Sequence, residues 1–363
     1  MRPLRIALLF VRSGENATLS YQHGWPQAFM KSPLFDCTPI NLAGLSFGDR
    51  LAVARRLHAG KLDAIVLLHS VFSNQQNLRG LLFWALAACG VPKAYFIGNE
   101  YKLMPEKMRF CRLLGVSLLV TQSNDERVLA LYRTALGCAV TCIPNTGIDT
   151  KLFRPTTALV DRPIDIGYRS YEAPLYLGNN EKVEIAQFFA RRAGIFSLNV
   201  DISLDPRHRF DAPGYAAFLN RCGGQIGTEA GGDYFELTDR TRHRVNAWVD
   251  RHPSDGWPEV RQRFFDDYGP AVPIRIISGR QVEAAACKTV QILFEGRYNG
   301  YFQPDVHFIP LRKDFANADE AMGKLRDVDY CSQLVENALE VVMVELTYDC
   351  LIRKFHQALS GAI

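Results

Sequence analysis

Short apolar runs alternate with longer mixed segments along the first half of the chain. Five of these runs have the nearly uninterrupted hydrophobicity of strands buried on both faces: Leu4–Phe10, Asp63–His69, Val91–Gly98, Val116–Thr121 and Ala139–Ile143. Three segments between them carry apolar residues at helical spacing: Phe47–His58, Leu78–Cys89 and Glu126–Leu136. Strands that alternate with helices in this way predict a parallel, doubly wound α/β domain.

The same alternation restarts after a linker. Prolines and polar residues at Phe153–Pro155 and Asp161–Pro163 interrupt the pattern, as a connection between domains does. Beyond them we expect strands at Ile164–Tyr168, Phe196–Val200, Ile274–Ser278 and Val290–Phe294, and helices at Lys182–Ala193, around Tyr215–Arg221, from Val282 and over most of residues 327–359. The second half therefore predicts another α/β domain of the same class.

Length and composition agree with two domains. The chain has 363 residues, and a domain typically takes about 150. The apolar stretch Leu81–Val91 is far shorter than the roughly 20 residues needed to cross a bilayer, so no membrane span is expected. The N-terminal run continues directly into Arg12 and Glu15, which favours a buried strand over a signal peptide. Nine scattered cysteines indicate neither disulfides nor a zinc site, and they fit a cytoplasmic location.

Charge is shared unevenly between the two halves. Residues 1–155 hold 18 Lys and Arg against 9 Asp and Glu, whereas the remaining 208 residues hold 24 against 29. This asymmetry fits a first domain that meets something anionic, including peripheral contact with a membrane, and it fits a solvated basic surface equally well. Nucleic acid is not expected as a partner, because the basic residues are not interleaved with aromatic ones.

Two motifs give the chain a resemblance to a known family. The segment Val140–Pro155, VTCIPNTGIDTKLFRP, resembles the domain junction I-P-N-G-V-D-x-x-x-F-x-P of GT-B glycosyltransferases, with Thr146 inserted. The segment Ile277–Lys288, ISGRQVEAAACK, resembles the donor-side signature E-A-x-A-C-G of the same superfamily. The strand, loop and return strand expected over Thr289–Leu311 continue the pattern of the group-1 glycosyltransferases, including the spore-maturation type.

The resemblance implies a fold, an organisation and an activity. It implies a GT-B fold, in which two Rossmann-like domains face a central cleft. Residues 1–155 would form the acceptor-side domain, residues 156–344 the domain that binds the nucleotide sugar, and residues 345–363 a helix that returns to the first domain. The implied activity is transfer of a sugar from a UDP- or GDP-sugar to a hydroxyl of a glycan, a lipid-linked acceptor or a small molecule. Assembly of glycans or secondary metabolites would use such a transfer.

The resemblance also implies donor-binding residues. Glu283 matches the glutamate that touches the nucleotide ribose, and Arg169 and Lys182 match the basic pair that binds phosphate. Ser278, Gly279 and Arg280 connect a strand to a helix, where backbone N–H groups point outward to a ligand. These cations would carry the phosphate charge without a metal or other cofactor. A surface salt bridge for Arg169 and a solvated helix position for Lys182 are the alternatives.

One position departs from the family. Retaining members have a second glutamate eight residues before the ribose glutamate, and this chain has Arg275 there. Glu229, in Gly227–Glu229, is another candidate near the donor. The departure keeps two alternatives open: a sugar-nucleotide epimerase or hydrolase, and a non-catalytic two-lobed protein that binds nucleotide sugars.

The candidates for the catalytic base follow the expected strands of the first domain. Glu15 follows the first strand, His69 ends the second, and Glu100 follows the third. Each would lie at the carboxyl edge of the sheet, where a carboxylate or a neutral imidazole can accept the proton of an acceptor hydroxyl. His23 is a further loop candidate. A histidine that only satisfies backbone groups at a strand end is the alternative for His69.

Overall fold

The computed structural model describes residues 2–12, 20–269 and 271–363. The chain divides into two compact units. The first unit contains residues up to Asn145, Phe235–Arg240 and Tyr348–Ile363, and the second contains Thr146–Tyr234 and Thr241–Thr347.

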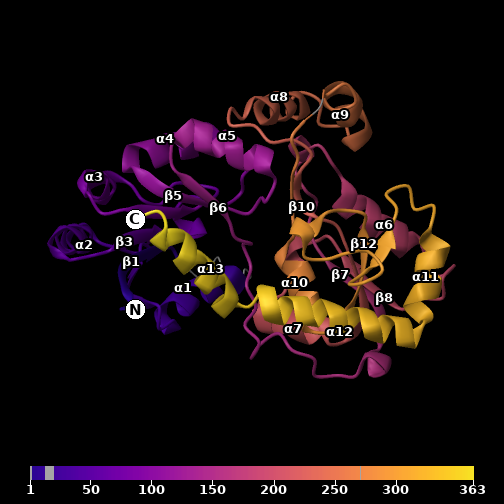
Figure 1. Cartoon of the computed structure of the whole chain (residues 1–363). Coiled ribbons are helices and arrows are strands. Elements are labelled where there is room, and N and C mark those ends of the chain that lie inside the picture. Colours follow the sequence, from indigo (N-terminus) through magenta and orange to yellow (C-terminus); the bar gives the residue numbers. More distant parts are fainter. Residues whose placement is uncertain (1, 13–19, 270) are drawn as a thin grey trace. The chain divides into compact units, whose positions relative to one another are not determined.

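The first unit is built on a six-stranded parallel sheet with the order β2-β1-β3-β4-β5-β6. Its strands are β1 (Leu4–Phe10), β2 (Phe35–Asn41), β3 (Ala64–Leu67), β4 (Lys93–Phe96), β5 (Val116–Thr121) and β6 (Ala139–Cys142). Its helices are α1 (Ser20–Lys31), α2 (Phe47–Ala59), α3 (Gly80–Ala88), α4 (Met104–Leu114), α5 (Glu126–Leu136) and α13 (Tyr348–Ser360). The strand order reverses after β2, so right-handed crossovers place α1 on one face and α2–α5 on the other. Figure 1 shows this unit in indigo and magenta, with α13 in yellow.

The strands expected in this unit are confirmed, and three elements are additional. Strand β2 has the sequence FDCTPIN, in which polar residues and Pro39 interrupt the apolar run that is typical of a buried strand. It lies at the edge of the sheet, where proline is tolerated. Helix α1 contains Gly24 and Pro26, two poor helix formers, and it includes the expected loop around His23. Helix α4 is the third element that the sequence pattern does not predict.

The final helix belongs to the first unit, as the resemblance implies. The ring of Phe355 in α13 lies 5.3 Å from that of Phe29 in α1 and 5.0 Å from that of Phe96 in β4. Tyr348 packs so closely on α1 that a Cβ added at Gly24 would lie 2.0 Å from its hydroxyl oxygen. Any side chain with a Cβ at position 24 would therefore clash with Tyr348 in this position.

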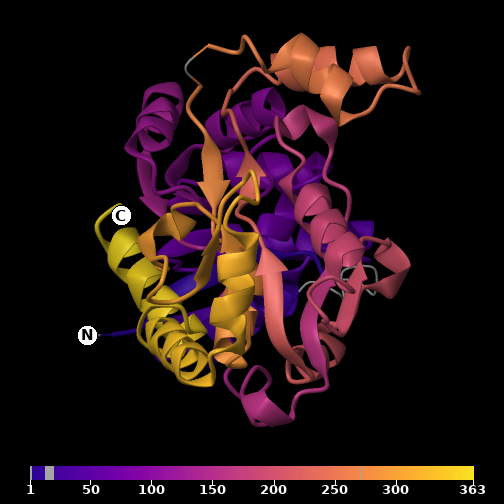
Figure 2. The ribbon, with the colours of Figure 1, turned by 90° about the vertical axis from the view of Figure 1, so that its right-hand side faces the viewer.

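The second unit contains a five-stranded parallel sheet with the order β13-β12-β9-β7-β8, and the antiparallel pair β10-β11. Its strands are β7 (Ile164–Arg169), β8 (Val200–Ser203), β9 (Cys222–Gly227), β10 (Ala230–Gly232), β11 (Ile274–Ile276), β12 (Val290–Phe294) and β13 (Ile309–Leu311). Its helices are α6 (Glu181–Arg192), α7 (Ala212–Leu219), α8 (Arg240–Val249), α9 (Trp257–Phe264), α10 (Gly279–Ala286), α11 (Ala318–Arg326) and α12 (Val328–Glu345). Figure 2 shows the sheet from the side, with α8 and α9 lying together away from it.

Residues 235–240 form a small outlying part of the first unit. The carboxylate of Asp239 accepts hydrogen bonds from the backbone N–H groups of Leu103 (2.6 Å) and Met104 (3.2 Å), at the beginning of α4. The ring of Phe235 packs on that of Tyr132 in α5, with 5.2 Å between the centroids. These contacts fix the segment to the helices α4 and α5.

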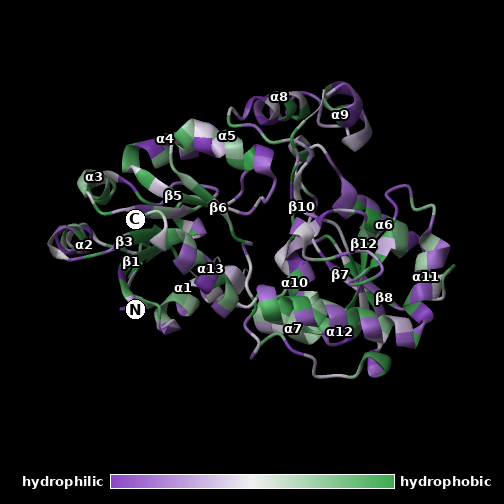
Figure 3. Ribbon diagram, viewed as in Figure 1, coloured by the Kyte–Doolittle hydropathy of each residue, from purple (hydrophilic) through white to green (hydrophobic). Residues whose placement is uncertain are grey.

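Hydropathy follows the layers of each unit. The strands of both sheets are coloured as hydrophobic in Figure 3, and their inner residues are buried. In the second unit the core lies between the sheet and helices α6, α11 and α12, and it includes Ile166, Phe189, Ile292 and Leu334. None of the described helices is long and apolar enough to cross a bilayer.

Candidate functional site

The second unit has a topological switch point between β7 and β9. The chain leaves β7 through α6 to the edge strand β8, and returns through α7 to β9 on the other side of β7. Connections that leave neighbouring strands in opposite directions open a crevice at their carboxyl ends, where open α/β sheets bind ligands. Here β7 ends at Arg169 and β9 at Gly227.

The N-terminus of α10 is held rigidly in this unit. Ser278 caps the helix through a reciprocal box with Gln281, and the backbone N–H of Ile277 donates to Oδ1 of Asn299 at 2.6 Å. A Cβ added at Gly279 would lie 2.7 Å from Oγ1 of Thr146, so only glycine fits beside that side chain. Thr146 is the residue inserted into the junction motif, and it is therefore packed against the first turn of α10.

Cations gather around Tyr171, two residues after β7. Nζ of Lys182 lies 4.7 Å from the centre of the Tyr171 ring, and the guanidinium of Arg209 lies 5.3 Å from it. The charges of Lys182, Arg280 and Arg209 lower the pKa of the Tyr171 phenol. We call Tyr171, Lys182, Arg209 and Arg280 the Tyr171 cluster.

Lys182 is the unusual member of the Tyr171 cluster. Only 7% of the residue is exposed, and burial together with the charge of Arg280 lowers the pKa of its ammonium group. A buried ammonium normally has a carboxylate partner. Among the described residues, however, the side chain that hydrogen-bonds to Lys182 is the phenol of Tyr171. The cluster thus carries excess positive charge that an anion would stabilise.

Arg169, the other half of the expected basic pair, is engaged elsewhere. One of its guanidinium nitrogens donates to the backbone oxygen of Asp201 at 2.8 Å, and the other to the Asp201 carboxylate at 2.7 Å. Its guanidinium also lies 4.4 Å from the centre of the Phe218 ring. The structure therefore places Arg169 in a salt bridge between β7 and β8, and a salt bridge is the alternative considered for it.

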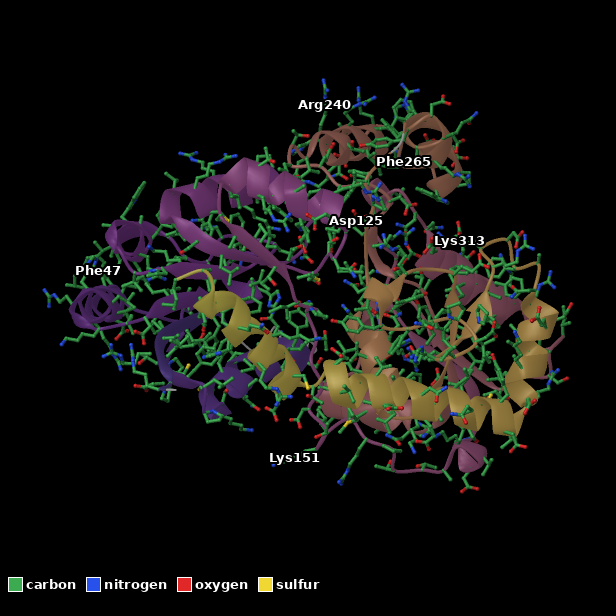
Figure 4. The ribbon with its side chains drawn as sticks, viewed as in Figure 1. Phe47, Asp125, Lys151, Arg240, Phe265 and Lys313 are labelled. Carbon is green, nitrogen blue, oxygen red and sulfur yellow. The ribbon has the colours of Figure 1, made fainter. Side chains whose placement is uncertain are left out.

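Arg275 joins a second, internally neutralised cluster. Its guanidinium donates two bonds of 2.8 Å to the Glu181 carboxylate and one of 2.6 Å to Asp233. Lys313, labelled in Figure 4, lies 2.7 Å from Glu181 as well. Burial opposes ionisation of Glu181, but Arg275 and Lys313 outweigh it and hold the pKa of its carboxyl at about 2. Arg275 thus anchors the first residue of α6 to β11.

The remaining donor candidates are both buried carboxylates. Glu229 accepts backbone N–H bonds from Arg297 (3.1 Å) and Tyr298 (2.7 Å), while burial raises the pKa of its carboxyl. It therefore holds the turn after β12. Glu283 lies one turn into α10, 7% exposed, on the same helix as Gly279 and Arg280.

Among the acceptor-side candidates, His69 is enclosed by aromatic rings. His69 is 4% exposed among the rings of Trp25, Phe96 and Tyr21, and burial lowers the pKa of its imidazole to about 3. An imidazole with that pKa is a weak proton acceptor, although it can still hydrogen-bond in its neutral form. Glu15 lies outside the described residues.

Glu100 has a structural environment. Its carboxylate accepts bonds from the Thr121 hydroxyl, from the backbone N–H of Gln122 at 2.9 Å and from the Tyr132 hydroxyl at 2.7 Å. Burial raises the pKa of this carboxyl, and the three donors oppose that rise. With its oxygens committed to these donors, Glu100 ties β5 to α5 and is poorly placed to accept a proton from a substrate.

Two members of the Tyr171 cluster are absent from the sequence-based candidates. Tyr171 follows β7 directly, so the rule that ligands bind at carboxyl ends of strands could have found it. Arg209 lies between β8 and α7 in a segment with no motif, and no sequence signal points to it. Within the described part of the chain, no three His, Cys, Asp or Glu side chains are grouped as metal ligands.

Comparison with known proteins supports the fold. No family model and no curated protein matches the chain. Sucrose-phosphate synthase from Thermosynechococcus elongatus superposes with a TM-score of 0.52 at 13% identity, over 99% of this chain and 98% of that one. A glycosyltransferase from Rickettsia africae gives a TM-score of 0.49 at 10% identity, over 100% and 99% of the two chains. Anabaena HepE in complex with UDP-glucose gives 0.48 at 11% identity, over 99% and 100%. With two Rossmann-like units and a final helix in the first, the chain has the predicted GT-B fold.

Proposed function

We propose that this protein is a glycosyltransferase that takes a sugar from a nucleoside diphosphate sugar and passes it to an acceptor hydroxyl. The observation that carries the proposal is Lys182, a buried ammonium whose described surroundings add further positive charge instead of a carboxylate. It lies in the first turn of the helix that follows β7, beside the switch point of the unit that carries the donor-side motif. A diphosphate is an anion of the right charge for this cluster.

The donor would be held by three groups of this unit. Lys182 and Arg280 would bind the phosphates, together with the backbone N–H groups at the beginning of α10. Glu283, one turn further along α10, would accept the ribose hydroxyls. As the bond to the sugar breaks, negative charge grows on the leaving diphosphate, and preorganised cations stabilise that charge more than they stabilise the intact donor. We propose that this makes the reaction independent of a metal ion.

A nucleotide-sugar-binding protein without transferase activity is the second candidate. Arg275 favours it, because this cation stands where the resemblance places a glutamate beside the sugar, and Glu181 and Asp233 hold it there. An epimerase or a hydrolase of sugar nucleotides remains the third. In these two alternatives the donor site is the same and no acceptor is needed.

Release of nucleoside diphosphate from UDP- and GDP-sugars, with and without a panel of glycan and lipid-linked acceptors, distinguishes the three. A transferase releases the nucleotide faster when an acceptor is present, and EDTA leaves its rate unchanged. Glu283→Gln should weaken donor binding by about 1.5–3 kcal/mol, the range of a hydrogen bond to a charged group. Acceptor-independent release would favour a hydrolase, and conversion of the donor to its epimer without release would favour an epimerase. Binding with neither release nor conversion would favour the non-catalytic protein.

A further inference from the structure

Helix α3 presents an apolar face to solvent. Its sequence, GLLFWALAA, contains no charged side chain. Leu82, Phe83 and Leu86 are buried toward the sheet, but Trp84 is 59% exposed and Leu81 is 43% exposed. They lie three positions apart, so they share one side of the helix. The helix is largely coloured as hydrophobic in Figure 3. An uncharged helix whose outer side is also apolar is unusual in a layer that faces water.

The helices on either side of α3 carry exposed arginines. Helix α3 lies between α2 and α4 in its layer. Arg55 and Arg56 are exposed on α2, and Arg109 and Arg112 are exposed on α4. The three helices contain two carboxylates, and one of them, Asp49, is occupied in the cap of α2.

Three of these arginines are available for an external anion. Among the described residues no ion pair involves Arg55, Arg56 or Arg109. Arg112 instead donates to the backbone oxygen of Ala135 in α5. The apolar centre extends onto α4 through Leu113, which is 41% exposed. We call Arg55, Arg56, Leu81, Trp84, Arg109 and Leu113 the α2–α4 surface.

We propose that the α2–α4 surface docks on a membrane that contains anionic phospholipids. Tryptophan is favoured at the boundary between headgroups and acyl chains, where its ring is apolar and its N–H is polar. Arginines around it would lie level with the lipid phosphates, and each basic residue near such a membrane adds about 1 kcal/mol of binding, or about fivefold. This inference concerns a surface outside the donor site and holds whether or not the proposed function does.

A second copy of the chain is a poorer occupant for this surface. In a symmetric dimer the same patch meets itself, which would bring the arginines of α2 and α4 against those of the partner. Like charges facing each other oppose such an association. An anionic lipid surface satisfies the apolar centre and the basic flanks together.

Vesicle flotation with the full chain tests the proposal. Vesicles of phosphatidylcholine with about 30% phosphatidylglycerol should bind the protein, whereas vesicles of phosphatidylcholine alone should bind it at least tenfold more weakly. Trp84→Gln should weaken binding to the anionic vesicles about tenfold, through loss of the buried ring. Trp84→Leu should retain most of the binding. Arg55→Gln with Arg56→Gln should weaken it about 25-fold, and raising the salt concentration should release the wild type.

The matched control is Ile195→Gln, which replaces a side chain that is 73% exposed in the second unit. It should leave vesicle binding unchanged, and light scattering should show that each variant keeps the mass of the wild type. Equal binding to neutral and anionic vesicles, or no binding to either, would overturn the proposal. So would a wild-type dimer that Trp84→Gln converts to monomers, because the face would then belong to a second copy.

Discussion

At the scale of single residues, substitution of Lys182 distinguishes a ligand-binding role of this side chain from a structural one. A buried ammonium costs folding free energy, and methionine fills nearly the same volume without the charge. Lys182→Met should therefore leave the melting temperature unchanged or raise it. The same change should weaken binding of a nucleoside diphosphate by about 1.5–3 kcal/mol, since a charge-assisted hydrogen bond is lost. Thermal melts and titration calorimetry on the same sample measure both effects.

Arg169→Met is the matched control for this experiment. Arg169 bridges β7 and β8 through Asp201, so its loss should lower the melting temperature. Nucleotide affinity should be retained. The opposite pattern, in which Lys182→Met unfolds the protein and Arg169→Met abolishes binding, would show that Arg169 binds the phosphate and that the Tyr171 cluster is structural.

His69 predicts a pH dependence of stability. Burial lowers the pKa of its imidazole to about 3, whereas the unfolded chain has a value near the ordinary 6.5. Between these values the unfolded state binds more protons, so the free energy of unfolding falls as pH falls from about 6.5 toward 3. The slope contributed by one such group is at most about 1.4 kcal/mol per pH unit.

Denaturant titrations at several pH values between 7 and 4 test this dependence. His69→Gln removes the titrating group, so its curve of stability against pH should be flatter than that of the wild type. The control substitution His243→Gln, at an exposed side chain, should leave the curve of stability against pH unchanged. Parallel curves for His69→Gln and the wild type would show that His69 is not the group responsible.

At the scale of elements, the contact between α1 and α13 depends on one missing side chain. Gly24→Ala places a methyl group against the Tyr348 hydroxyl, so the Tyr348 side chain must change its position or α13 must move away. Overpacking of this kind typically costs about 1–3 kcal/mol. Thermal melts should show a clear decrease for Gly24→Ala. Gly90→Ala is the control because its added Cβ meets nothing within 4 Å, and equal effects of the two changes would argue against the packing of α13 on α1.

Elements with a strong hydrophobic period could be predicted from sequence, and those with mixed chemistry could not. Strands β1, β3 and β5 are nearly uninterrupted apolar runs. In β2 and α1, by contrast, Pro39 and Pro26 obscure the pattern of the element. The same division holds in the site. The motif located the N-terminus of α10 with Gly279 and Glu283. The partner of Arg169 and the neighbours of Lys182 depend on residues from other loops, Asp201 and Arg209, which no local pattern connects to them.

At the scale of the whole molecule, the uneven distribution of charged residues corresponds to two separate features of the structure. In the first unit, exposed arginines lie on α2 and α4, the helices next to the apolar face of α3. In the second unit, which has more acidic than basic residues overall, positive charge is concentrated around Tyr171 while Glu181 and Asp233 neutralise Arg275. A chain-wide count of charges could indicate an anionic partner, but only the tertiary structure separates the surface proposed to dock on a membrane from the site proposed to bind phosphate.

Calorimetric titration of the wild type with UDP, GDP and other nucleoside diphosphates, in buffer containing EDTA, is the most direct test of the donor site. At least one of them should bind without a metal ion. Lys182→Met should weaken that binding by an order of magnitude or more, while Arg169→Met should not. A folded wild-type protein that binds no nucleoside diphosphate, or Lys182→Met that binds as tightly as the wild type, would contradict the proposed donor site.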